Sequence, residues 1–263
     1  MIENRVKRVW REGGIALGAY SGSFGTSSMV EIIGLAGFDA VFIDMEHFPF
    51  DFRDVHMMVL TAERVGITPI VRTPGFDPAF ILRLLDMGVQ GIYLPHIDNA
   101  AAARKAVEAV YYPPQGDRGM MGASRVADYG KIPLAQYMEQ SNREVLLAVM
   151  IEDLKALDEI DEIAAIKGVD LIVVGPADMS RALGVAGQPN HPKLVAVMER
   201  VTEAVKKSKN ARLSLATGNA MFPRSISQLR DMGVSYTNVS PMPDARLLKI
   251  LSQQVVDLRK ELA

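Results

Sequence analysis

The sequence predicts an α/β fold, a single (β/α)8 TIM barrel that spans residues 1–263 as one domain. Short β-branched apolar segments alternate eight times with amphipathic stretches of helical spacing. Eight such units fit the usual size of this barrel, about 250 residues. Several helical stretches also end close to a glycine, as C-terminal capping requires.

The open, doubly wound sheet is the alternative architecture for such an alternation. Its phosphate-binding glycine signals are missing, because no GxGxxG motif follows the first expected strand and no GxxxxGK[ST] motif occurs anywhere. The chain also has no linker or low-complexity segment that would mark a second domain. The closed barrel is therefore the favoured prediction.

Each expected strand is a short apolar run followed by a loop rich in Gly, Pro or Asp. The eight strands are expected at residues 15–20, 40–44, 69–72, 91–94, 146–151, 171–174, 212–216 and 236–239. In a barrel of parallel strands, their carboxyl ends would meet at one rim.

Helices are expected between these strands, where apolar residues recur with helical spacing. They are expected at residues 27–36, 51–65, 78–87, 99–110, 154–166, 192–208, 224–232 and 244–262. Five glycines follow helical stretches closely and precede the next strand: Gly37, Gly66, Gly88, Gly168 and Gly233. The long interval 111–144 predicts a functional loop with a short helix.

The composition excludes several kinds of chemistry. With 49% hydrophobic residues the chain can bury a full core, and without cysteine it has no disulfide, thiolate nucleophile or cysteine-bound metal. Only four histidines are present. A metal site would therefore depend on carboxylate oxygens, which favour hard cations such as Mg2+ or Mn2+.

The charge distribution also excludes some partners. The net charge is −2 and the basic residues form no continuous cluster, so no nucleic acid partner is expected. Residues 1–14 are charged and lack the apolar core of a signal peptide, and apolar runs such as 145–151 are far shorter than the roughly 20 residues that cross a bilayer. We therefore expect a cytoplasmic protein with no membrane partner.

Polar residues cluster after several expected strands, where barrel enzymes carry their catalytic groups. They are Asp44, Glu46, His47, Arg72, Glu152, Asp153 and Asp178. Each has an ordinary alternative, because strand-end aspartates often cap helices or belong to turns. Their joint occurrence favours a site with two separated carboxylates, an imidazole and a guanidinium. His96 also follows a strand, but exposed loop histidines are common there and we assign it no catalytic role.

Five motifs carry a family resemblance. They are Asp44-Met45-Glu46-His47, Val71-Arg72-Thr73-Pro74, Tyr112-Pro113-Pro114 with Gly116-Asp117-Arg118-Gly119, Ile151-Glu152 and Gly175-Pro176-Ala177-Asp178-Met179-Ser180. In this order they resemble the HpcH/HpaI aldolase family over nearly the whole chain. That family comprises class II, metal-dependent pyruvate aldolases such as 4-hydroxy-2-oxoheptanedioate aldolase and 2-dehydro-3-deoxyglucarate aldolase. The resemblance implies a barrel of the phosphoenolpyruvate/pyruvate-binding type.

The resemblance further implies a divalent cation, Mg2+, Mn2+ or Co2+, held by Glu152 and Asp178. It implies that a 2-oxo acid chelates this cation and that the loop matching Gly175, Pro176, Ala177 and Asp178 binds the substrate carboxylate. The substrate partners would be pyruvate and an aldehyde.

The implied reaction is the reversible cleavage of a 4-hydroxy-2-oxo acid through a pyruvate enolate. Arg72 would stabilise the enolate oxygen, and His47 would exchange the proton of the 4-hydroxyl group, through water. The family pattern pairs this histidine with an acidic residue that matches Asp86, and Asp44 is a second candidate for that role. Either carboxylate would orient the imidazole.

Other mechanisms remain as alternatives. A Schiff-base lysine is disfavoured, because no lysine closely follows an expected strand. A related metal enzyme could cleave malyl-CoA or citramalyl-CoA, or decarboxylate oxaloacetate, through the same enolate. A non-catalytic barrel that binds a 2-oxo acid is the third hypothesis. Departures from the family pattern at Tyr20-Ser21, Met150 and 240–243 lie on the expected pocket wall, so the aldehyde is the least transferable property.

An oligomer is expected from the family and from the last helical stretch. Residues 244–262 carry more apolar positions than a helix on one barrel face needs. The resemblance implies a homohexamer, a trimer of dimers, in which this helix is exchanged between subunits. It also implies that segment 111–144 reaches towards an adjacent active site.

Overall fold

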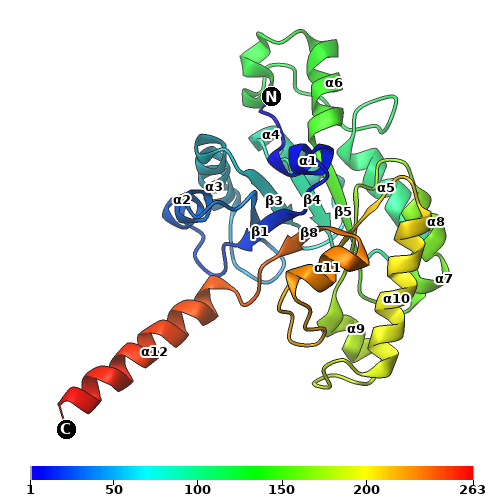
Figure 1. Cartoon of the computed structure of the whole chain (residues 1–263). Helices are drawn as coiled ribbons and strands as arrows, with labels where there is room; N and C mark the ends of the chain where they lie inside the picture. Colours follow the sequence, from blue (N-terminus) through cyan, green and yellow to red (C-terminus); the bar gives the residue numbers. More distant parts are fainter. Residues whose placement is uncertain (1, 263) are drawn as a thin grey trace.

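Eight parallel strands close into a barrel in the computed structural model, which describes residues 2–262 (Figure 1). The strands neighbour one another in sequence order, and β8 pairs with β1. Their bounds are β1 (Ala16–Tyr20), β2 (Ala40–Asp44), β3 (Thr68–Arg72), β4 (Gly91–Leu94), β5 (Leu146–Ile151), β6 (Leu171–Val174), β7 (Arg212–Ser214) and β8 (Val234–Asn238). The predicted barrel is confirmed, and the alternative open sheet is wrong.

Helices connect the strands and surround the barrel (Figure 1). They are α1 (Arg5–Arg11), α2 (Ser27–Leu35), α3 (Phe52–Val65), α4 (Pro78–Met87), α5 (Ala100–Val110), the 3-10 helix η1 (Arg125–Gly130), α6 (Leu134–Glu144), α7 (Lys155–Asp158), α8 (Ile160–Ala165), α9 (Pro176–Ala182), α10 (Pro192–Lys207), α11 (Ile226–Met232) and α12 (Pro243–Glu261). Glycines stop three of them where predicted, because Gly66, Gly88 and Gly233 are left-handed C-caps.

Two helices were not predicted and one prediction was too long. The periodicity did not indicate α1 or α9, each of which has only seven residues. The helix expected at 154–166 is interrupted at Glu159, so that α7 and α8 are separate. Segment 111–144 contains a loop, η1 and the 11-residue α6.

The barrel interior is a core of its own, distinct from the apolar layer between strands and helices. Because side chains alternate along a strand, Phe42 belongs to the interior while Val41 and Ile43 pack towards the helices. Val6 and Trp10 of α1 join the inner core. Helix α1 therefore closes one end of the barrel.

Hydrogen bonds fix α1 to the end of the barrel where the strands begin. The backbone N–H of Asn4 donates to Glu144 Oε2 at 2.9 Å, and the Asn4 side chain donates to the carbonyl of Gln90 at 3.1 Å. Trp10 Nε1 donates to the carbonyl of Ser235 at 2.8 Å. Glu144, Gln90 and Ser235 lie at or next to the starts of β5, β4 and β8. Helix α6 lies on the same side as α1 (Figure 1).

Helix α12 extends away from the barrel and has no buried residue (Figure 1). Its exposed apolar side chains are Leu247, Leu248, Ile250, Leu251, Val255, Val256, Leu258 and Leu262, the last of which follows the helix. No helix within residues 2–262 is both long enough and apolar enough to cross a membrane.

Candidate active site

Arg72 and Asp44 form a buried ion pair at the carboxyl ends of β3 and β2. The two residues are register partners in the parallel pair, so their side chains meet directly. Arg72 Nε lies 2.9 Å from Asp44 Oδ1, and Arg72 Nη2 lies 2.5 Å from Asp44 Oδ2. Burial lowers the pKa of Arg72, but the hydrogen bonds and charge of Asp44 outweigh it, so this pKa is raised. The guanidinium is thus a fixed positive charge in a fixed orientation.

Glu46 is the second carboxylate beside this guanidinium. Its Oε2 lies 3.1 Å from Arg72 Nη1, and this buried oxygen has no hydrogen-bond partner among the described residues. Its Oε1 lies 3.0 Å from His96 Nε2. Glu46 therefore links the end of β2 to the loop after β4.

His96, to which the sequence analysis assigned no catalytic role, connects Glu46 with Glu152. Its backbone N–H donates to Glu152 Oε1 at 2.7 Å, and its Nδ1 lies 2.9 Å from the same oxygen. His96 has a φ of 58°, a left-handed conformation that is uncommon for a residue other than glycine. Its position after β4 was the only signal in the sequence.

Glu152 and Asp178 supply carboxylates from the ends of the neighbouring strands β5 and β6. Burial raises the pKa of Glu152, and the nearby charges of Asp178 and Glu46 raise it further, against the lowering effect of His96. The Asp178 side chain is 44% exposed, and its Oδ1 lies 3.6 Å from Arg181 Nε. Asp153, by contrast, accepts the backbone N–H of Lys155 and belongs to the turn into α7.

This pair of carboxylates fits a hard divalent cation. No group of three or more His, Asp or Glu residues within 2–262 is arranged to hold a metal ion. Mg2+, however, is commonly bound through one or two carboxylates, with water and substrate completing its coordination. A cation between Glu152 and Asp178 would also relieve the repulsion that raises the Glu152 pKa.

The backbone approaches these carboxylates at Gly175, between β6 and α9. A Cβ atom at this position would lie 2.5 Å from Met150 Cε and 3.3 Å from Glu152 Cβ. Gly175 and the first turn of α9, residues 176–178, line a cavity of about 210 Å3 together with Arg72 and His47. The loop that was expected to bind a carboxylate is therefore beside the expected metal ligands.

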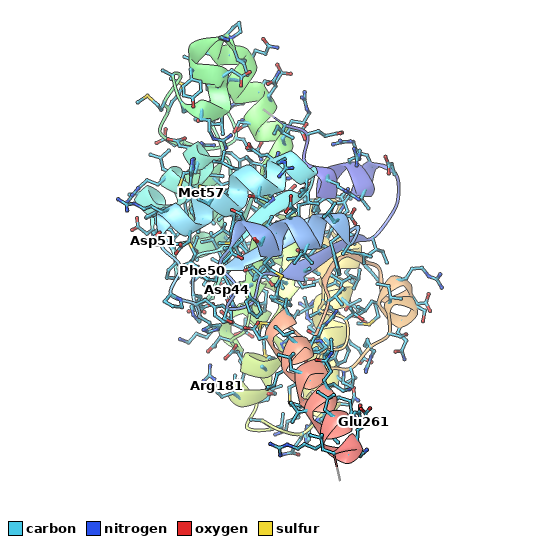
Figure 2. All side chains as sticks on the ribbon, turned by 90° about the vertical axis from the view of Figure 1, so that its left-hand side faces the viewer. Asp44, Phe50, Asp51, Met57, Arg181 and Glu261 are labelled. Carbon is cyan, nitrogen blue, oxygen red and sulfur yellow. The ribbon has the colours of Figure 1, made fainter. Side chains whose placement is uncertain are left out.

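His47 lies where this cavity meets a second one of about 590 Å3, and it lines both. Its side chain is 62% exposed, and its Nε2 is 3.9 Å from Glu46 Oε2. Asp44 accepts the backbone N–H of His47 at 3.3 Å, so it holds the turn rather than the ring. Asp44 also lies near the start of α12 (Figure 2), and the larger cavity includes both.

The expected contact between Asp86 and His47 is wrong for residues of the same chain. Asp86 is in the last turn of α4, next to the start of β4, whereas His47 follows the end of β2. Helices of the barrel run opposite to the strands, so Asp86 lies at the amino end. There its Oδ1 accepts from Arg118 Nη2 at 2.7 Å. Among the other predicted residues, Arg72 contacts Asp44 and Glu46, and it lines one cavity with His47 and Asp178. Their roles stay predictions.

The fold and the site define a TIM-barrel enzyme whose cavity at the carboxyl ends of the strands is lined by Arg72, His47 and Asp178. Residues 19–233 match the model of the HpcH/HpaI aldolase/citrate lyase family. The chain is 35% identical over 236 residues to a pyruvate aldolase of Rhizobium etli, covering 90% of each chain. It is 32% identical over 265 residues to a 2-keto-3-deoxy-L-rhamnonate aldolase of Salmonella gallinarum, covering 99% of this chain and 98% of the relative.

A solved structure shows the same similarity. An HpcH/HpaI aldolase from Desulfitobacterium hafniense DCB-2 superposes with a TM-score of 0.86 at 29% identity, over 96% of both chains. The chain belongs to the HpcH/HpaI aldolase/citrate lyase family. It is an aldolase-type lyase, and the resemblance seen in the five motifs is confirmed.

Proposed function

We propose that the protein is a class II aldolase, which cleaves a 4-hydroxy-2-oxo acid reversibly into pyruvate and an aldehyde with the help of a divalent cation. One observation carries this proposal: Arg72, Gly175 and Asp178 line a single cavity at the carboxyl ends of the strands. Glu152 lies directly behind Gly175, near enough to Asp178 for its charge to raise the Glu152 pKa. Named relatives, including a pyruvate aldolase, support it.

Glu152 and Asp178 would hold the cation, which is Mg2+, Mn2+ or Co2+. When bound, such a cation supplies Lewis-acid stabilisation to a 2-oxo acid as it becomes an enolate. The backbone N–H groups of Ala177 and Asp178, in the first turn of α9, would bind the substrate carboxylate. A side chain at Gly175 would displace the end of the Met150 side chain and press on Glu152, so glycine lets this backbone lie close to the expected metal ligand.

Arg72 would act on the oxygen that gains charge. When the C3–C4 bond breaks, its electron pair moves into pyruvate and forms the enolate, while the 4-hydroxyl carbon becomes the aldehyde carbonyl. The guanidinium is already oriented by Asp44 and Glu46, so little reorganisation is needed as the charge develops. Asp44 is in this sense a positioning residue.

His47 would accept the proton that leaves the 4-hydroxyl group. Imidazole can accept and return a proton near neutral pH, and His47 lies where the two cavities meet. Asp44 would fix the backbone of this turn through the N–H of His47. Because Asp86 lies at the other end of its own barrel, it could orient a His47 ring only in a second copy of the chain.

We also propose a homohexamer, a trimer of dimers, with α12 exchanged between subunits. The support is the apolar surface of α12, which no part of the described chain covers. Such an exposed apolar surface is typical of an interface.

The decisive experiment is retro-aldol turnover of several 4-hydroxy-2-oxo acids, with pyruvate release measured before and after complete removal of metal by EDTA. We expect turnover that EDTA abolishes and that added Mg2+, Mn2+ or Co2+ restores. Activity without any metal would refute the mechanism. Oxaloacetate and malyl-CoA serve as parallel substrates, and turnover of these alone would favour the related lyase reactions instead.

A further inference from the structure

The larger cavity adjoins the smaller one, and most of the residues that line it are uncharged. It shares Tyr20, His47, Arg72 and Asn219 with the smaller cavity. If the smaller cavity holds the pyruvate part, as the proposed function requires, the aldehyde part extends past His47 into the larger one. The lining of the larger cavity then decides which aldehydes are accepted.

Most of this lining is uncharged. Apolar surface comes from Phe48, Ala220, Pro241, Met242 and Ala245. Asn219, Ser240 and Tyr20 offer neutral hydrogen-bonding groups. Such walls suit a carbon chain that carries hydroxyl groups.

The guanidinium of Arg72 in this lining already contacts two carboxylates and, in the proposed mechanism, acts on the enolate oxygen. Among the residues described, Arg72 is the one arginine that lines the cavity, and no lysine does. Both oxygens of Asp44 accept hydrogen bonds from Arg72, and Glu46 Oε2 lies 3.1 Å from its third nitrogen. A second anion would find its positive charge matched by two carboxylates.

Asp244 adds a negative charge that forms no ion pair within residues 2–262. The backbone N–H of Ser23 donates to its Oδ1 at 3.0 Å, and the Ser23 hydroxyl also contacts this oxygen. Burial raises the pKa of Asp244, but these hydrogen bonds outweigh it and lower the pKa. The nearby Arg246 is turned away, because its Nε donates to the carbonyl of Pro241 at 2.8 Å and its Nη2 to that of Ser240 at 3.2 Å.

The geometry points to a cavity that selects neutral, hydroxylated aldehydes and disfavours those with a carboxylate, sulfonate or phosphate. An anionic tail would lie beside Asp44 and Asp244. Among the residues described, the basic side chains of this lining are Arg72, which two carboxylates already contact, and His47. Like charges that close to each other raise the energy of the bound state. Asp244 is the specificity-determining residue in this view.

The test uses pairs of aldehydes that differ mainly in charge, each added to pyruvate by the metal-loaded enzyme. Suitable pairs are methyl 4-oxobutanoate with 4-oxobutanoate, and glyceraldehyde with glyceraldehyde 3-phosphate. We expect kcat/KM to be at least tenfold higher for the neutral member of each pair. The Asp244→Asn variant should narrow this ratio at least threefold, because it removes the charge and keeps an oxygen for Ser23.

Asp257→Asn is the matched control, since Asp257 is an exposed carboxylate of the same helix that lies 3.7 Å from Lys260 Nζ. It should leave the ratio unchanged. Raising the salt concentration should reduce the ratio of kcat/KM for the neutral aldehyde to that for the anionic one in the unmodified enzyme. This measurement does not depend on the folding of a variant.

Equal or faster addition of the anionic members would overturn the inference while supporting the proposed function. The inference would also be overturned if neither Asp244→Asn nor salt changed the ratio of kcat/KM for neutral and anionic aldehydes. If no aldehyde adds to pyruvate, the proposed function itself fails.

Discussion

Replacing Asp44 by asparagine tests the ion pair on which the site depends. Asparagine keeps one acceptor oxygen, which can still accept from Arg72 Nε and from the backbone N–H of Glu46 and His47. It replaces the other oxygen, which lies 2.5 Å from Arg72 Nη2, by an NH2 donor. The variant therefore loses one charge-assisted hydrogen bond and the charge that matches Arg72.

The expected loss of stability is large because both partners are buried. The side chains of Arg72 and Asp44 are only 12% and 6% exposed. Removing one partner of a buried pair costs about 3 to 5 kcal/mol, and the retained oxygen favours the lower end of this range. Because Arg72 would also lose its fixed orientation, we expect kcat to fall by about 100-fold.

Urea unfolding and steady-state retro-aldol kinetics measure these two effects. The control is Asp161→Asn, because Asp161 forms a similar two-bond pair with Arg200, at 3.1 and 2.6 Å, but its side chain is 60% exposed. Water screens that pair, so its loss should change stability much less and kcat not at all. Equal destabilisation by both substitutions would refute the reasoning.

Three further predictions follow from other contacts. Glu152→Gln should abolish Mn2+ binding measured by calorimetry, and a variant that still binds Mn2+ as tightly would show that the ligand is assigned wrongly. Glu144→Gln should destabilise the protein at neutral pH. Burial raises the pKa of Glu144, but the hydrogen bonds from the Asn4 N–H and from Arg143 have the larger effect and lower this pKa below the ordinary value of 4.5. The carboxylate therefore stabilises the fold above pH 4.5 and loses this effect as pH falls through the lowered pKa, so urea unfolding at acid pH should show no difference from the unmodified protein. The unmodified protein should be oligomeric by light scattering. The double variant Leu251→Glu with Val255→Glu in α12 should have a lower molar mass in solution, because it places charges on the exposed apolar surface. A monomeric unmodified protein at micromolar concentration would refute the proposed oligomer.

The barrel could be predicted from sequence because its signals are local. Each buried strand is a short apolar run, and Gly66, Gly88 and Gly233 stop the preceding helices where predicted. The strand-end position of Glu152 and Arg72 likewise follows from chain order alone. Local patterns did not predict α1, because its core residues Val6 and Trp10 lie in a seven-residue segment with four basic residues.

The site was harder to predict, because its contacts depend on distances between strands. That Asp44 lies opposite Arg72 is a matter of register, and that His96 links two glutamates depends on its unusual backbone conformation. Asp86 was paired with His47 from a family pattern alone. The direction of α4 already places Asp86 at the other end of the barrel, and that argument was available from the sequence.

The closure of the barrel by α1 affects the order of events in turnover. With Val6 and Trp10 packed into the interior, α1 covers the amino end of the barrel in the part of the chain that the structure describes. Both reactants then use the same mouth, and the smaller cavity reaches deeper among the inner side chains Phe42, Tyr93 and Val173. In condensation we therefore expect a compulsory sequence, with the 2-oxo acid first in and the aldehyde second. In cleavage the aldehyde should depart first, so pyruvate should be the product that competes with the substrate for the free enzyme.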